Sequence, residues 1–316
     1  MQPLATGLWP VMLTPFKTNN EVDKEGLQRL TNFYLDAGSN GLFANCLSSE
    51  MFQLTEKERL AITKTVVDTA DGRVQVVATG SFSSDIQINA DFIKKLYDTG
   101  VAAVVISTSQ LVTEFDSDAV FKRKMEALLS QTGNIPLGLY ECPVPYKKVL
   151  SPELLGWMAQ TGRFLYHKDT CCSLSMLKQK LKAIEGTNMG LYNAHVSTGW
   201  DSLLNGARGL SPIGANFYPE LFAYFLQHWK NGRSDEKLKK LDATLSIMDA
   251  VIHHNYPHIA KLFLQKRGLN ISSESRISRT ALDDDTHYKL NSLMFLLDQI
   301  AAELEIKLAN TDSVGA

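Results

Sequence analysis

The feature that most constrains the fold is a repeated alternation of short apolar segments with longer amphipathic ones. Eight expected strands, joined by expected helices, follow one another over about 215 residues and make up eight β/α units. The expected strands are residues 8–14, 41–45, 74–79, 102–106, 135–140, 163–167, 189–193 and 210–213. Such an alternation predicts a parallel sheet of the α/β class, and eight units predict closure into a (β/α)8 TIM barrel. A doubly wound open sheet is the alternative that the same alternation leaves open.

The helices expected between these strands carry start signals of their own. Thr55 and Glu58 have the spacing of a capping box, and the segment 84–87 has the same pattern. Ser151 followed by Pro152 predicts an N-cap and a first-turn proline. The expected helices cover residues 23–37, 55–70, 86–97, 116–130, a short stretch after 152, 173–183 and 198–205.

The chain after residue 217 lacks strand signals and is expected to be helical. Its apolar spacing predicts four helices, at residues 218–230, 235–253, 256–267 and 282–306. The sequence therefore predicts a barrel over residues 1–217, with a C-terminal helical extension over residues 218–316 packed on it.

Composition and charge exclude several classes of function. Lys and Arg total 32 against 34 Asp and Glu, a net charge of -2, which argues against a nucleic-acid-binding protein. The longest apolar run, Val101 to Ile106, is far shorter than the roughly 20 residues that span a membrane. The N-terminus has no cationic leader, and the four cysteines form no CxxC pair. We therefore expect a cytoplasmic protein with free thiols and no membrane partner.

Two residues stand where barrel enzymes place their chemistry, at the carboxyl ends of strands. Lys168 directly follows the sixth expected strand, and burial there would lower its pKa and supply a free amine that attacks a carbonyl. Tyr140 ends the neighbouring fifth strand, where a phenol beside such a lysine can relay protons. The structural alternatives are a lysine paired with Asp169 and a tyrosine that only packs the barrel.

Further candidates lie in loops after other strands. Ser48 and Ser49 follow the second strand and offer donors for a substrate carboxylate, or form an ordinary polar loop. Gln110, His195 and Ser211 are expected as further substrate-binding residues, with a satisfied strand-end histidine as the alternative for His195. The histidines lack metal-ligand spacing and no nucleotide-binding fingerprint is present, so we expect neither a metal nor a cofactor.

Several motifs, in consistent order, resemble one family. Thr14-Pro15-Phe16 resembles the family's opening, and residues 48–59 resemble its (Ser/Thr)-Thr-Gly-Glu…Leu-Thr…Glu-Arg motif. Tyr140-Glu141-Cys142-Pro143 resembles its Tyr-Asn-x-Pro motif, Lys168-Asp169 its Lys-(Glu/Asp) pair, and residues 206–209 with Asn216 its glycine-rich eighth-strand segment. On these motifs the chain resembles the dihydrodipicolinate synthase / N-acetylneuraminate lyase family of class I, pyruvate-type Schiff-base aldolases.

The resemblance implies an enzyme and assigns roles to its residues. Lys168 would form a Schiff base with the keto carbon of pyruvate or a longer 2-oxo acid, and Tyr140 would relay protons. Ser48 and Ser49 would hold the substrate carboxylate. The implied activity is that of a carbon–carbon lyase that reversibly cleaves a 2-oxo acid into pyruvate and an aldehyde. The resemblance also implies a homotetramer or a homodimer.

The chain departs from the family pattern at places that bear on the substrate. Leu47 stands where the family has its first Ser/Thr, and Thr108-Ser109-Gln110 replaces a Pro-Tyr-Tyr segment. Pro145 stands where true synthases have the arginine that grips the aldehyde's carboxylate. We therefore expect no dihydrodipicolinate synthase activity. A dehydratase of a 2-oxo-3-deoxy sugar acid, or a non-catalytic homologue that binds 2-oxo acids, remains as an alternative.

Overall fold

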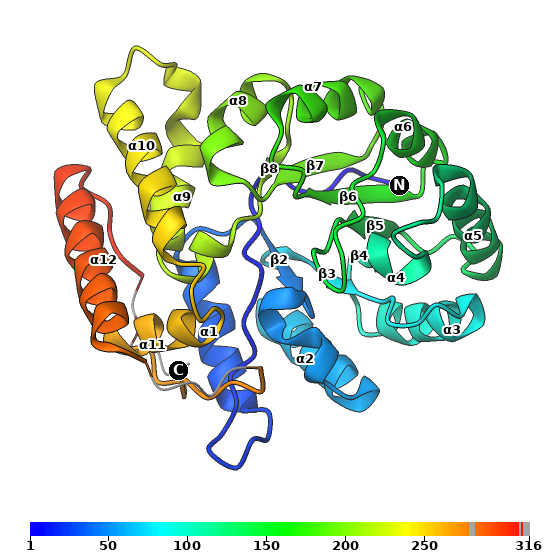
Figure 1. The fold of residues 1–316 in the computed structure, drawn as a ribbon. Helices are drawn as coiled ribbons and strands as arrows, with labels where there is room; N and C mark the ends of the chain where they lie inside the picture. Colours follow the sequence, from blue (N-terminus) through cyan, green and yellow to red (C-terminus); the bar gives the residue numbers. More distant parts are fainter. Residues whose placement is uncertain (278–281, 310, 312–316) are drawn as a thin grey trace. The chain divides into compact units, whose positions relative to one another are not determined.

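The structure, a computed structural model, describes residues 1–277, 282–309 and 311 (Figure 1). It divides the chain into two compact units, each built from segments far apart in the sequence. The first unit comprises Met1–Thr6 and Gln75–Ser211, and the second comprises Gly7–Val74 and Pro212–Ala316. The predicted division at residue 217 stays a prediction.

Six strands of the first unit pair in parallel and in chain order (Figure 1). The pairs β3–β4, β4–β5, β5–β6, β6–β7 and β7–β8 all show parallel register. Nearly every residue of these strands is buried, as expected for a parallel sheet whose strands read as continuous apolar runs. The strands are β3 (Gln75–Thr79), β4 (Ala103–Ser107), β5 (Leu137–Tyr140), β6 (Phe164–Asp169), β7 (Gly190–Asn193) and β8 (Gly209–Leu210).

Helices of the first unit alternate with these strands. They are α3 (Ile86–Tyr97), α4 (Thr108–Leu111), α5 (Asp118–Gln131), α6 (Pro152–Gln160), α7 (Leu174–Ala183) and α8 (Gly199–Leu204). The predicted cap of α6 is confirmed, because the Ser151 side chain accepts from the backbone N–H of Leu154 and Pro152 opens the helix. The short helix α4 was not predicted.

The predicted capping box at Ser84 is wrong. The N-cap of α3 is Asp85, whose carboxylate accepts hydrogen bonds from the backbone N–H groups of Gln87 and Ile88. A carboxylate can satisfy two of the free amides at once and also interacts favourably with the positive end of the helix dipole.

The second unit contains the first two strands with their helices, and the C-terminal helices. These are β1 (Gly7–Leu8), α1 (Lys24–Asp36), β2 (Gly41–Ala44), α2 (Glu56–Ala70), α9 (Pro219–His228), α10 (Glu236–Val251), α11 (His258–Lys266) and α12 (Asp284–Glu303). The capping box of α2 is confirmed, as are the four predicted C-terminal helices. The first strand is shorter than predicted: beyond Leu8 only Val11 bridges Phe43, because Pro10 cannot donate to a ladder.

All eight strands expected from the sequence are found within the described residues, each followed by helical structure. No helix in that part of the chain is long and apolar enough to cross a membrane.

Candidate functional site

The structure brings together the two residues that were predicted to carry chemistry. Tyr140 is the last residue of β5 and is paired in register with Lys168 of β6. The Lys168 Nζ atom lies 4.7 Å from the centroid of the Tyr140 ring. Each of the two residues is only 3% exposed. The Lys168 Nζ atom therefore lies over an aromatic ring and largely out of water, at the carboxyl ends of two neighbouring strands.

Alternation along β6 divides its side chains between the two faces of the sheet. Tyr166 shares the face of Lys168, stacks on Tyr192 with ring centroids 4.6 Å apart, and donates a hydrogen bond of 3.1 Å to the Ser211 hydroxyl. Ser211, a predicted substrate-binding residue, thus takes part in a buried network on that face.

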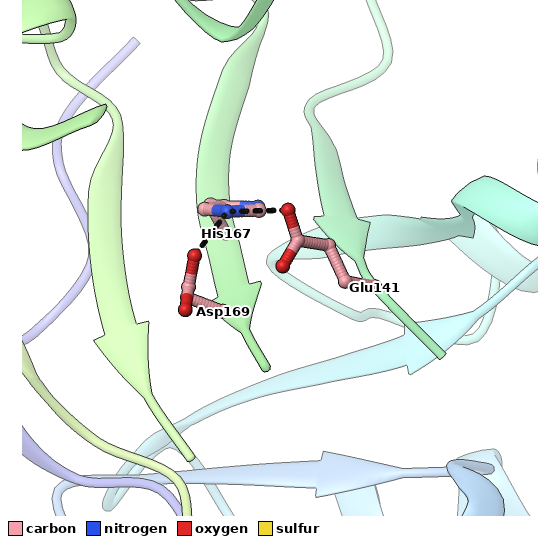
Figure 2. A group of neighbouring side chains, drawn as sticks. All are labelled: Glu141, His167 and Asp169. Atoms are coloured by element: carbon pink, nitrogen blue, oxygen red, sulfur yellow. Dashed lines mark ion pairs between the residues drawn. The ribbon is translucent and has the colours of Figure 1, made fainter. Parts of the chain in front are cut away.

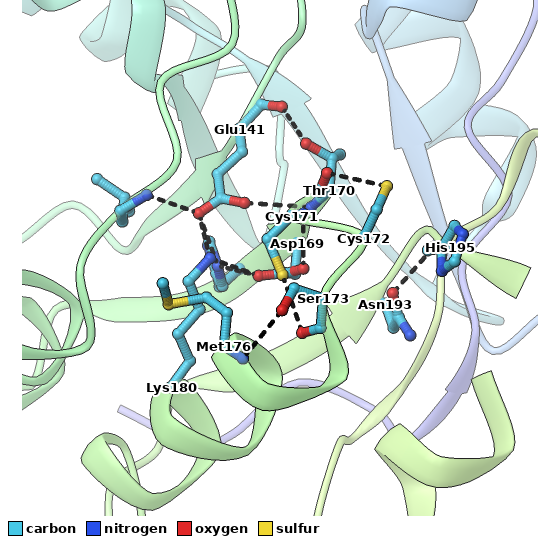
Figure 3. Close-up of polar contacts among 12 residues, drawn as sticks. Glu141, Asp169, Thr170, Cys171, Cys172, Ser173, Met176, Lys180, Asn193 and His195 are labelled. Carbon is cyan, nitrogen blue, oxygen red and sulfur yellow. Dashed lines mark hydrogen bonds and ion pairs between the residues drawn. The ribbon is translucent and has the colours of Figure 1, made fainter. Parts of the chain in front are cut away.

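The opposite face carries a buried charge cluster formed by Glu141, His167, Asp169 and Lys180 (Figures 2 and 3). The Lys180 ammonium, from α7, donates to Glu141 Oε1 at 2.5 Å and to Asp169 Oδ2 at 2.6 Å. The His167 Nε2 atom lies 3.7 Å from the first carboxylate and 3.6 Å from the second. The ion pair of Asp169 is therefore with Lys180, on the face of β6 away from Lys168.

Lys180 and Asp169 each keep their charged form through their partners in this cluster. Burial alone would lower the pKa of Lys180, but the carboxylates of Glu141 and Asp169 outweigh it and raise that pKa. Burial likewise acts to raise the pKa of Asp169, but His167 and Lys180 stabilise the carboxylate and lower it. The cluster thus holds an ammonium between two carboxylates, with each member protected from water.

Three of these side chains have the spacing of a metal site, since ligand atoms of Glu141, His167 and Asp169 all lie within 4.8 Å of one another (Figure 2). The Lys180 ammonium already lies at hydrogen-bond distance from both carboxylates. A metal ion would have to displace that buried ammonium. We therefore conclude that the Lys180 side chain, and not a metal ion, is the cation of this cluster.

The two predicted serines of the loop after β2 differ in their contacts. Ser49 donates its hydroxyl hydrogen to the Met12 carbonyl at 2.6 Å and its amide hydrogen to the Cys46 carbonyl at 3.0 Å. Both of its donors are therefore used by backbone carbonyls of the protein itself. Ser48, which is 3% exposed, accepts a hydrogen bond of 2.6 Å from the Tyr256 hydroxyl. Ser48 is thus the better candidate for a ligand contact.

The same loop is fixed by Glu50, which adopts a left-handed backbone conformation with φ 58°. Its buried carboxylate accepts hydrogen bonds from Lys261 Nζ at 2.6 Å, from the Ser275 hydroxyl at 3.0 Å and from the backbone N–H of Arg276 at 2.6 Å. These contacts tie the turn that carries Ser48 to the C-terminal part of the second unit.

The remaining predicted residues are half-buried. The backbone N–H of His195 donates to Asn193 Oδ1 at 2.9 Å (Figure 3), and its ring Nδ1 lies 3.1 Å from the Thr198 hydroxyl. Gln110 lies in the short helix α4. The contacts of His195 are those of a strand-end histidine with local partners, and its role toward a substrate stays a prediction.

Sequence reasoning missed two residues, Lys180 and Tyr256. A usable signal existed for Lys180, because Leu177, Leu181 and Ile184 define an apolar face of α7 that includes this lysine. Nothing in the local sequence connects Tyr256 with Ser48, which lies 208 residues earlier.

Comparisons with known proteins agree on one family. The sequence model of the Dihydrodipicolinate synthetase family matches residues 4–295. The chain is 26% identical over 303 residues to the L-2-keto-3-deoxyarabonate dehydratase of Azospirillum brasilense, covering 94% of this chain and 96% of that protein. It is 27% identical over 289 residues to a 4-hydroxy-tetrahydrodipicolinate synthase of Cereibacter sphaeroides, covering 91% and 97%.

Solved structures show the same fold. The crystal structure of YagE, a prophage protein of the dihydrodipicolinic acid synthase family from Escherichia coli K12 in complex with pyruvate, aligns with a TM-score of 0.83. That alignment covers 93% of this chain and 98% of the other, at 23% identity. The predicted (β/α)8 barrel with a C-terminal helical extension is thereby confirmed.

Proposed function

Because the chain belongs to the dihydrodipicolinate synthetase family, we propose that it is a Schiff-base lyase that reversibly cleaves a 2-oxo acid into pyruvate and an aldehyde. The observation that carries the proposal is the Lys168–Tyr140 pair, with the buried Nζ atom 4.7 Å from the ring centroid. A nucleophilic amine and a proton-carrying phenol at adjacent strand ends are the two groups that this chemistry needs.

In the proposed reaction the Lys168 amine attacks the keto carbon, and water leaves to form a protonated imine. The imine accepts the electron pair of the breaking C–C bond, while the hydroxyl of the departing part loses its proton and becomes an aldehyde. Tyr140 relays that proton to the enamine carbon. Hydrolysis of the resulting imine releases pyruvate and restores the amine.

Ser48 binds the substrate carboxylate in this proposal. Ser49 stabilises the loop after β2 through its hydrogen bonds to Met12 and Cys46. Fixed donors on the carboxylate orient the bond to be broken. Pro145 has no donor for a second carboxylate, so the aldehyde part is neutral and dihydrodipicolinate synthesis is not the reaction. Ser211, His195 and Gln110 are proposed contacts for the rest of the substrate. The cytoplasmic location and the homotetramer or dimer stay predictions from the sequence.

A dehydratase of a 2-oxo-3-deoxy sugar acid is the second candidate, and the dehydratase relative from Azospirillum brasilense favours it. The same imine at Lys168 would lose a proton from the carbon beside the imine carbon, and the resulting enamine would expel the hydroxyl group of the next carbon as water, with all carbons retained. The two candidates share every step up to the imine and differ only in the bond that breaks next.

Incubation with a panel of neutral-tailed 2-oxo acids, followed by product analysis, tests the proposal. Release of pyruvate and an aldehyde supports the lyase, whereas loss of water with all carbons retained supports the dehydratase. Binding of these 2-oxo acids without turnover would support the alternative that the protein is a non-catalytic homologue. Efficient condensation of pyruvate with aspartate semialdehyde would contradict the substrate assignment.

Tyr140→Phe should lower turnover by roughly 10²-fold, as expected for loss of one acid–base group, and leave imine formation with pyruvate nearly unchanged. Steady-state kinetics and borohydride trapping measure the two effects separately. Tyr192→Phe is the matched control, because the Tyr192 hydroxyl donates to the Ala5 carbonyl at 2.7 Å. Equal turnover of Tyr140→Phe and the unmodified protein would assign the proton relay elsewhere.

A further inference from the structure

A chain of hydrogen bonds in the second unit, two of them buried and two partly buried, ends at Ser48. Asn216 Nδ2 donates to the Val11 carbonyl at 2.8 Å and to the Tyr256 hydroxyl at 2.5 Å. The Tyr256 hydroxyl donates in turn to Ser48 Oγ at 2.6 Å. At the other end of the amide, the Tyr34 hydroxyl donates to Asn216 Oδ1.

The direction of every bond in this chain follows from one backbone carbonyl. The Val11 oxygen can only accept, so the amide nitrogen of Asn216 must face it, and its second hydrogen points to the Tyr256 oxygen. The single hydroxyl hydrogen of Tyr256 is then directed to Ser48. Ser48 accepts that bond, and its own hydrogen is left to donate to another group.

Burial keeps the chain in this state. Tyr34 and Asn216 are fully buried, and burial raises the pKa of Tyr34 and of Tyr256. Both phenols therefore keep their hydrogens at neutral pH, and Tyr256 remains a donor toward Ser48. A serine hydroxyl in water can donate to or accept from any neighbour. The Ser48 oxygen instead accepts from Tyr256, so its own hydrogen points away from Tyr256 and can only donate to another group.

We propose that Tyr256 is a positioning residue that fixes Ser48 as a hydrogen-bond donor for the carboxylate of the 2-oxo acid. This inference rests on the proposed function, in which Ser48 holds that carboxylate. A carboxylate only accepts hydrogen bonds, so a serine locked as a donor favours it over groups that donate or carry no charge. Tyr256 thus acts on substrate selection through Ser48, without contacting the substrate itself.

Tyr256→Phe should raise the pyruvate concentration for half-maximal borohydride trapping about 10-fold. This factor is at the low end of what the loss of a hydrogen bond to a charged group costs in affinity. The maximal rate of trapping should change little. The concentration needed for methyl pyruvate should rise less, because its uncharged ester accepts a weaker hydrogen bond than a carboxylate does. Tyr218→Phe is the matched control, because the buried Tyr218 hydroxyl has no hydrogen-bond partner among the described residues.

Ser48→Ala and the double variant complete the test. If Tyr256 acts through Ser48, the double variant should need the same pyruvate concentration for half-maximal trapping as Ser48→Ala alone. Equal trapping of pyruvate by Tyr256→Phe and the unmodified protein would overturn the inference and leave the proposed function standing. Equal losses for pyruvate and methyl pyruvate would overturn it as well, since they indicate a general structural effect. Failure of the unmodified protein to trap pyruvate would instead refute the proposed function, and this inference with it.

Discussion

Replacing Lys168 by alanine should lower turnover of every 2-oxo acid substrate by about 10⁴-fold or more, as expected when a covalent nucleophile is removed. The side chain is 3% exposed and lies against the Tyr140 ring, so its loss also leaves a cavity at the strand ends. Steady-state kinetics at saturating substrate measures the effect, with circular dichroism to confirm folding.

Lys178→Ala is the matched control for this variant, because Lys178 is exposed on α7. It should keep the turnover of the unmodified protein. Turnover of Lys168→Ala within 10-fold of the unmodified protein would show that the reaction does not pass through an imine at this residue.

Lys180→Met should destabilise the protein by about 3–5 kcal/mol, the cost of leaving buried charges without their partner. Glu141 and Asp169 would remain buried as carboxylates with no ammonium between them. A loss of this size lowers the melting temperature by about 10 °C in a protein of this size. Thermal unfolding followed by circular dichroism measures it, and Lys178→Met on the exposed side of α7 should unfold like the unmodified protein.

Adding Glu141→Gln to Lys180→Met should recover part of that loss, because it removes one uncompensated buried charge. The Glu141 carboxylate also accepts from the backbone N–H of Leu150 at 2.9 Å, a bond that the amide oxygen of glutamine can still accept. Unchanged unfolding of Lys180→Met would mean that the cluster contributes nothing to stability.

The parts of the fold that depend on local pattern could be predicted from the sequence. The all-apolar run 102–106 indicates a strand buried on both faces, and Ser151-Pro152 places a helix start to the residue. The proximity of Tyr140 and Lys168 could be predicted as well, because successive strands of a parallel barrel are neighbours and both residues lie at the carboxyl end of a strand.

Contacts between distant segments could not be predicted in this way. The pairing of Lys180 with Glu141 and Asp169 depends on which face of α7 meets the sheet, and a lysine is ordinarily assigned to the solvent side. The difference between Ser48 and Ser49 depends on the turn that directs one hydroxyl to Met12 and leaves the other to Tyr256. Neither the turn nor its partner is visible in the local sequence.

Borohydride reduction in the presence of pyruvate, followed by mass spectrometry of the intact protein and its peptides, tests most directly whether Lys168 forms an imine. We expect one pyruvate-derived adduct per chain, located on the peptide that contains Lys168 and absent from Lys168→Ala. The absence of any adduct, or an adduct on another lysine that persists in Lys168→Ala, would contradict the proposed function.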